Sequence, residues 1–147
     1  RRQADYHRSL LGDALWRNLV NRIANKSAVE GEYAERIIDQ TVGFLRVCAA
    51  NPSVSFTPSA AVDLGWDEFI LHTREYADFC ARNAGRFIHH APLYRDRGNE
   101  STQENPDTAA AMLSMGIWVD NTLWSSNGSC KGSKCESHDC RNLTAWP

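Results

Sequence analysis

Apolar residues recur every three or four positions through most of the first 85 residues, and this spacing restricts the fold more than any other feature. Such spacing is typical of helices that bury one face. It predicts helices over residues 11–23, 27–50 and 59–84, and a fourth that begins at Asn105–Pro106 and ends at Gly116. The pattern therefore predicts an all-α fold of about four helices, with one short extended segment at residues 86–90.

Local signals mark where these helices should begin and end. Ser27 is followed three residues later by Glu30, which is the spacing of a capping box. Thr57 precedes Pro58, a favourable pair for an N-cap and a first helical residue. Gly85 suits the left-handed conformation that ends many helices. We therefore expect helix starts at Ser27 and Thr57 and a helix end before Gly85.

The sequence changes character after residue 124. Residues 125–147 are rich in Ser, Gly, Lys and Cys and have no apolar periodicity. A chain of 147 residues has room for one hydrophobic core. We therefore expect one helical domain, residues 1–124, and an irregular tail, residues 125–147, that packs on it or is clipped to it.

Charge and motif content exclude several classes of function. The net charge is −2 and no basic stripe is present, so nucleic-acid binding is not expected. No apolar run approaches the roughly 20 residues of a membrane span, which predicts a cytoplasmic protein without membrane contact. Gly-x-Gly-x-x-Gly, P-loop, Gly-x-Ser-x-Gly and His-Glu-x-x-His motifs are absent, so nucleotide and serine-hydrolase sites have no basis.

The third predicted helix carries acidic residues that could form a site. Asp63 and Asp67 are one turn apart on one flank, close enough to share a ligand. His72 lies roughly 140° from Asp67 around a straight helix, so these two residues are not expected to bind the same metal ion. The alternative is a solvated helix flank in which Arg74 pairs with Asp78.

A pair of histidines, His89 and His90, follows the turn at Gly85. Neighbouring side chains in an extended segment point to opposite faces, so only one of the two should share a pocket with Phe87. One of them could meet Asp67 or His72 across the turn, which would give a pair suited to proton transfer or metal binding. The alternative is a structural, hydrogen-bonded histidine.

The tail contains a cluster of potential zinc ligands. These are Cys130, Cys135, His138 and Cys140. Three thiolates and one imidazole match the donor set of a tetrahedral zinc site. A disulfide within the tail and a reduced, metal-free tail are the alternatives. The other two cysteines, Cys48 and Cys80, lie on apolar helix faces and are expected to be core residues.

Several of these residues also resemble a known family motif. Val62, Asp63, Trp66, Leu71, Tyr76 and Cys80 follow the spacing of the core motif of the glycine-rich-domain-containing-protein-like family. Phe69–Thr73, Gly85–His90 and Val119–Trp124 resemble segments of its short actinobacterial members. The family pattern has His directly after the Trp, whereas this chain has Asp67. The resemblance covers about residues 30–140 and implies a bacterial accessory or tailoring role in specialised metabolism.

The leading hypothesis is a small metal-binding protein with zinc in its tail and a second polar site. The candidate residues of that site are Asp63, Asp67, His72, His89 and His90. Their chemistry would be acid–base or metal-assisted catalysis on a small molecule or a modified peptide. One alternative is a non-catalytic protein- or peptide-binding module that uses Trp118, Trp124 and Trp146. Another is a metal-free enzyme that uses a His/Asp pair.

Overall fold

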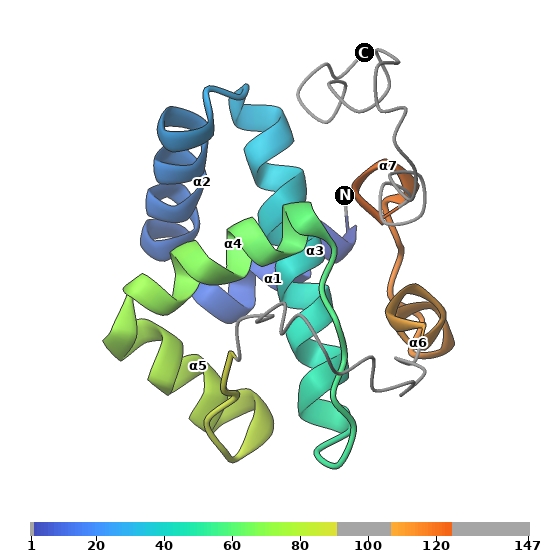
Figure 1. The fold of residues 1–147 in the computed structure, drawn as a ribbon. Coiled ribbons are helices and arrows are strands. Elements are labelled where there is room, and N and C mark those ends of the chain that lie inside the picture. Colours follow the sequence, from blue (N-terminus) through green and yellow to red (C-terminus); the bar gives the residue numbers. More distant parts are fainter. Residues whose placement is uncertain (1, 91–106, 125–147) are drawn as a thin grey trace, which may run out of the picture.

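A computed structural model describes residues 2–90 and 107–124, and these residues form seven α-helices without a strand (Figure 1). The helices are α1 (Arg2–Leu11), α2 (Asp13–Ser27), α3 (Gly31–Ala50), α4 (Ala60–Leu71), α5 (Thr73–Ala84), α6 (Thr108–Ser114) and α7 (Asn121–Trp124). The all-α prediction is confirmed for the described residues. The expected number of about four helices was too low.

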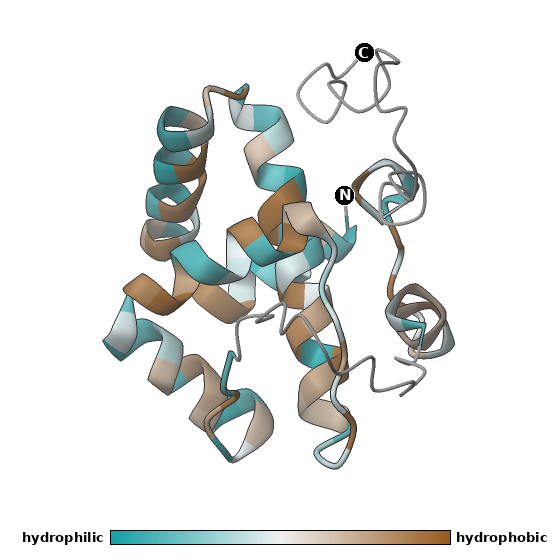
Figure 2. Cartoon of the chain, viewed as in Figure 1, coloured by the Kyte–Doolittle hydropathy of each residue, from teal (hydrophilic) through white to brown (hydrophobic). Residues whose placement is uncertain are grey.

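Helix α3 is the centre of the fold. It packs against α1, α2, α4, α5 and α6. Its buried residues continue around the helix and include Asp39, Gln40 and Thr41 as well as the apolar stripe. Figure 2 shows the apolar residues of α2 on the side turned toward α3. Five of the other six helices of the described residues therefore pack directly on α3, and α7 packs on α4.

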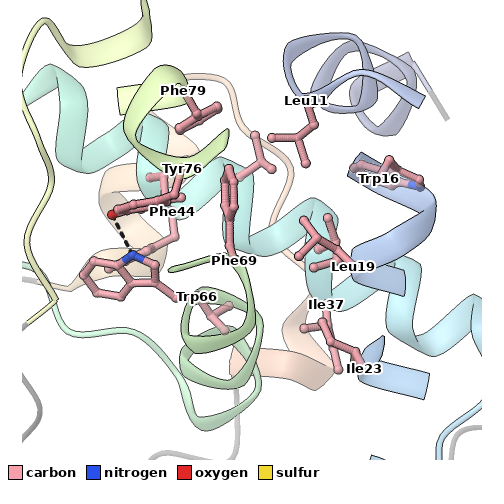
Figure 3. Close-up of a cluster of buried hydrophobic side chains, with 14 of the residues drawn as sticks. Leu11, Trp16, Leu19, Ile23, Ile37, Phe44, Trp66, Phe69, Tyr76 and Phe79 are labelled. Carbon is pink, nitrogen blue, oxygen red and sulfur yellow. Dashed lines mark hydrogen bonds between the residues drawn. The ribbon is translucent and has the colours of Figure 1, made fainter. Parts of the chain in front are cut away.

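The main core lies between α2, α3, α4 and α5 (Figure 3). Trp16, Leu19 and Ile23 of α2 contribute to it, and aromatic residues of α4 and α5 fill the opposite side. Phe69 packs edge-on against both Tyr76 and Phe79, with ring centroids 5.1 Å and 5.3 Å apart. This aromatic cluster fixes α5 against α4.

The predicted single helix over residues 59–84 is two helices that meet at His72. The His72 backbone leaves the helical region at φ −84° and ψ 68°, and its N–H bonds to the Phe69 carbonyl. The Nδ1 atom of its ring bonds the Glu68 carbonyl at 3.0 Å, which a continuous helix would bond through a backbone N–H. Beyond this break Phe79 is buried in the core, whereas Thr73 and Ala77 are exposed.

The expected helix starts are also corrected. Ser27 is the last residue of α2, and α3 begins after Glu30, so the capping box does not form. Ser59 rather than Thr57 is the N-cap of α4, because its Oγ accepts a 3.2 Å hydrogen bond from the Val62 N–H. Gly85 does cap α5 in the left-handed conformation, with φ 67°, as predicted.

The N-terminal helix α1 was not predicted. Its apolar content is low, and one of its two buried residues is His7. Gly12, with φ 84°, separates α1 from α2 and allows a sharp change of direction. A weakly apolar helix that buries a polar residue has little of the periodicity on which the prediction depended.

The segment after α6 is bound to the N-terminal half by polar contacts. The Trp118 N–H donates to Gln3 Oε1 at 2.7 Å, and the Asp120 N–H donates to Gln40 Oε1 at 2.9 Å. Arg36 also forms a salt bridge with Asp120. Residues 117–124 therefore belong to the helical domain.

Two predictions fall partly or wholly outside the described part of the chain. The proposed tail ligands Cys130, Cys135, His138 and Cys140 lie there, so zinc binding by the tail stays a prediction. The division at residue 124 stays a prediction for the same reason. Within residues 2–90 and 107–124, no helix is both long and apolar enough to cross a membrane.

Candidate metal-binding site

The segment from Gly85 to His90 leads the chain from α5 back to α4. Its side chains alternate: Ile88 is buried and His90 is half-buried, whereas Phe87 and His89 are exposed. The His89 ring lies against Phe87, with centroids 4.8 Å apart. The opposite directions of the two histidines are those that an extended segment predicts.

His90 meets two of the three acidic residues of α4. Its Nε2 lies 2.8 Å from Oδ1 of Asp63 and 2.9 Å from Oδ1 of Asp67. Asp63 and Asp67 are on one face of α4 because they are four residues apart. The turn at Gly85 therefore brings an imidazole to a pair of carboxylates from a neighbouring helix.

The His90 ring is held flat on Trp66. The two rings are parallel within 4°, and their centroids are 4.0 Å apart. The His90 side chain is 13% exposed, whereas those of Asp63 and Asp67 are 44% and 61% exposed. The imidazole therefore forms the inner side of the cluster and the carboxylates form its side toward solvent.

Tyr76 lies directly beneath this arrangement. The Trp66 indole N–H donates to the Tyr76 hydroxyl at 2.9 Å, as Figure 3 shows, and the hydroxyl donates to the Ile88 carbonyl. Burial raises the pKa of the Tyr76 phenol above its ordinary value. Tyr76 therefore stays protonated at neutral pH and keeps the hydrogen that it donates.

Asp63, Asp67 and His90 offer three ligand atoms that all lie within 4.8 Å of one another. Two carboxylate oxygens and one imidazole nitrogen suit divalent ions such as Zn²⁺ and Mn²⁺. Without an ion, the same contacts allow a proton on Nε2 to be shared with the carboxylates. The cluster is thus suited to metal binding or to proton exchange.

The other two residues of the predicted site lie elsewhere. His89 is exposed beside Phe87. His72 caps the break between α4 and α5, and it lines a shallow cleft with Asp13 and Glu75. The sequence prediction therefore combined residues from three separate places, of which Asp63, Asp67 and His90 form one cluster.

A second polar cluster, around His7, was not predicted. The fully buried His7 lies with its Nδ1 2.8 Å from Oδ1 of Asp39, and its Nε2 accepts from Arg46 at 3.1 Å. Gln3 and Gln40 each donate to Oδ2 of Asp39 at 3.1 Å. Burial alone would raise the pKa of Asp39, but the His7 contact and the two amides outweigh it and lower that pKa. These contacts join α1 to α3 inside the protein.

The cysteines and tryptophans that the sequence singled out are distributed as follows. Cys48 and Cys80 are free, buried core thiols, and burial raises the pKa of Cys48 to about 12. Trp118 is 59% exposed. Trp124 is half-buried and donates its indole N–H to Gln40. Trp146 lies outside the described residues.

The signals for the site's supporting residues were present but ambiguous in the sequence. Trp66 and Tyr76 are large, mainly apolar residues of the helix predicted over residues 59–84, and both are buried in the core. Each also has one polar atom that must find a partner when it is buried. Only the tertiary structure shows that the Trp66 indole donates to the Tyr76 hydroxyl. The same hydroxyl donates to the Ile88 carbonyl, two residues before His90.

Comparison with known proteins corrects the family resemblance. The family model described as UCP032817-like matches residues 9–106, a range that holds α2 to α5 and all three residues of the cluster. The resemblance to the glycine-rich-domain-containing-protein-like family was wrong, because residues of a helical core recur at similar spacing in unrelated proteins. The role in specialised metabolism depended on that resemblance and loses its basis.

The searches of curated proteins and of solved structures found no match. The family model covers about two thirds of the sequence, from α2 to beyond α5. The chain belongs to the UCP032817-like family.

Proposed function

We propose that the protein binds a divalent metal ion through Asp63, Asp67 and His90 and uses it in metal-assisted chemistry on a small molecule or a modified peptide. The observation that supports this is the position of His90 Nε2, 2.8 Å and 2.9 Å from two carboxylate oxygens. Donor atoms bound to one ion at about 2.1 Å lie roughly 3.0 to 3.4 Å apart. The two distances to His90 Nε2 are slightly shorter than this range, and all three ligand atoms lie within 4.8 Å of one another, so adjustment of the two exposed carboxylates would accommodate an ion.

The exposure of the carboxylates supports an open coordination sphere. Three protein ligands leave at least one position for water or substrate, as in catalytic rather than structural zinc sites. Asp63 and Asp67 form the side of the cluster that faces solvent, so such a ligand has access. A bound ion would lower the pKa of its water and polarise a carbonyl or phosphoryl oxygen of a substrate.

The test must separate this site from the tail thiols, which are themselves candidate zinc ligands. We would replace Cys130, Cys135 and Cys140 by serine in the full-length chain and titrate it with Mn²⁺, which prefers oxygen and nitrogen donors. Calorimetry should give one site per chain. Asp67→Asn should weaken binding at least tenfold, by analogy with the 10–100-fold effects of altered metal-site residues.

The matched control is Asp78→Asn. Asp78 is also exposed, at 63% against 61% for Asp67, and its partner is Arg82 rather than His90. The Asp78 variant should bind Mn²⁺ as the parent does. Absence of binding in the parent, or equal binding in the Asp67 variant, would refute the proposal.

The same contacts support a second candidate, acid–base catalysis without a metal. His90 Nε2 is within hydrogen-bond distance of two carboxylates, as a proton-transfer pair requires. Once an activity is known, a chelator distinguishes the two candidates. Chelation would abolish metal-assisted catalysis and leave a metal-free reaction unchanged.

A further inference from the structure

The position of His90 depends on a segment that has little backbone support. Among the described residues, residues 86–90 make no backbone–backbone hydrogen bond. Two side chains hold the backbone here: Arg86 Nη2 donates to the Cys48 carbonyl at 2.7 Å, and Tyr76 donates to the Ile88 carbonyl. The Tyr76 bond is two residues from His90, whereas the Arg86 bond is four residues away.

Tyr76 is well placed to hold this segment because it is itself immobilised. Its side chain is fully buried and packs edge-on against Phe69 on α4. Phe87, from the extended segment, also packs edge-on against the Tyr76 ring, with centroids 5.2 Å apart. Tyr76 therefore contacts the segment at Phe87 through its ring and at Ile88 through its hydroxyl.

The same hydroxyl also fixes the surface on which His90 lies. It accepts the Trp66 indole N–H at 2.9 Å, and Trp66 then presents its face to the imidazole at 4.0 Å. Rotation of the indole would break this hydrogen bond and remove the stacking surface. The Tyr76 hydroxyl oxygen thus bonds both Trp66, on which the His90 ring stacks, and the backbone at Ile88, two residues before His90.

We infer that Tyr76 is a positioning residue, whose hydroxyl sets the imidazole of His90 between Asp63 and Asp67. The inference adds a supporting residue to the proposed metal site, and its predicted effect on metal affinity rests on that proposed function. Tyr76 touches neither the carboxylates nor the place of the ion, so its effect passes through Trp66 and Ile88. Loss of an outer-shell residue that orients a metal-binding histidine typically weakens metal binding by about 10–100-fold. Tyr76 would have this role through the stacking surface and the backbone, because His90 Nδ1 has no hydrogen-bond partner among the described residues.

The decisive variant is Tyr76→Phe in the full-length chain with the three tail cysteines replaced by serine. Phenylalanine keeps the ring and its packing and removes only the hydroxyl. We expect Mn²⁺ binding to weaken by about 10–100-fold, while far-ultraviolet circular dichroism stays that of the parent. Unchanged Mn²⁺ affinity in this variant would overturn the inference.

Ile23→Val controls for general destabilisation. Ile23 is buried in the main core on α2. The Ile23→Val variant should unfold at a lower temperature than the parent and bind Mn²⁺ with the same affinity. If Ile23→Val and Tyr76→Phe reduce affinity equally, the effect of Tyr76 is one of stability and the positioning role is wrong.

A metal-free measurement separates this inference from the proposed function. The ring nitrogens of ¹⁵N-labelled histidine report the surroundings of each imidazole at a fixed pH, and a His90→Gln variant assigns the His90 signals. In Tyr76→Phe, the His90 signals should move toward those of the exposed His89, while the signals of buried His7 stay in place. Unmoved His90 signals would overturn the inference, whether or not the parent binds Mn²⁺. If the His90 signals move in Tyr76→Phe and the parent binds no Mn²⁺, the positioning role is supported and the metal site is refuted.

Discussion

At the scale of single residues, the sequence singled out the three residues of the cluster but not the tertiary contacts that bring them together. The four-residue spacing of Asp63 and Asp67 was enough to place them on one helix face. The sequence predicted the turn at Gly85, but the meeting of His90 with them also depends on the contacts of Ile88, which no local pattern specifies. His72 lies apart from the cluster, at a helix break that nothing in Leu71-His72-Thr73 predicts.

Gly65 is required by the close crossing of α3 and α4. A Cβ atom at this position would lie 2.2 Å from Oγ1 of Thr41 and 2.9 Å from Cγ2 of Ile37. Gly65→Ala should therefore destabilise the protein by about 1–3 kcal/mol through overpacking, measured by urea unfolding. Gly31→Ala is the control, because a Cβ there meets nothing within 4 Å. Equal stability of the two variants would contradict this account of the helix crossing.

Asp39 should make stability depend on pH. Its pKa is lowered in the folded protein, so the unfolded chain binds more protons in the interval between the folded and unfolded pKa values. The contribution of Asp39 is present above the unfolded pKa, near 3.8, and is lost as the pH falls through the folded pKa. The unfolding free energy of the parent should thus exceed that of Asp39→Asn by more at pH 6 than at pH 3.

Asp13→Asn is the matched comparison, because the Asp13 side chain is 72% exposed in its pair with Arg8. Urea unfolding of the parent, Asp39→Asn and Asp13→Asn at pH 3 and pH 6 measures how the free energy of unfolding of each variant differs from that of the parent. A gap between the parent and Asp39→Asn that is the same at pH 3 and pH 6 would show that the charge of Asp39 does not stabilise the fold.

At the scale of helices, periodicity predicted the class and several helices but not their boundaries. The helix predicted over residues 27–50 corresponds to α3, whose buried residues run from Tyr33 to Cys48. The start of α3 was wrong because Ala28 adopts a left-handed conformation after α2, and the chain turns before Glu30. Helix ends depend on single dihedral angles and hydrogen bonds, which several candidate residues in a row can supply equally well.

The N-cap of α4 offers a direct test of this point. Ser59 is buried and its Oγ accepts from the Val62 N–H at 3.2 Å. Ser59→Ala should cost about 1 kcal/mol of stability, because the Val62 donor would lose its partner. Thr57→Ala should cost less, since Thr57 lies before the helix. A larger loss of stability in Thr57→Ala than in Ser59→Ala, measured by thermal unfolding, would instead identify Thr57 as the N-cap, as the Thr57–Pro58 pair predicts.

At the scale of the whole molecule, polar side chains of α1 and α3 hold residues 117–124 in place. Gln40 has the largest part: its Oε1 accepts from the Asp120 N–H and from the Trp124 indole, both at 2.9 Å. Its Nε2 donates to Asp39 and to the Trp118 carbonyl, each at 3.1 Å. Such a network is invisible to hydrophobic periodicity, which explains why the sequence indicated apolar anchors in this region and not the glutamines that hold it.

Gln40→Leu should loosen residues 117–124. Leucine keeps much of the side-chain volume but leaves the buried Asp120 N–H and the half-buried Trp124 indole without their acceptor, and a buried group that loses its partner costs about 1–3 kcal/mol. Hydrogen–deuterium exchange should therefore quicken in residues 117–124 and stay that of the parent in α2, because no hydrogen bond of Gln40 reaches α2 and the helix of the loosened segment, α7, packs against α4. Asn83→Ala, which removes only a hydrogen bond to the Phe79 carbonyl, should not alter exchange in that segment. Equal protection of residues 117–124 in the parent and in Gln40→Leu would mean that apolar packing alone holds the segment.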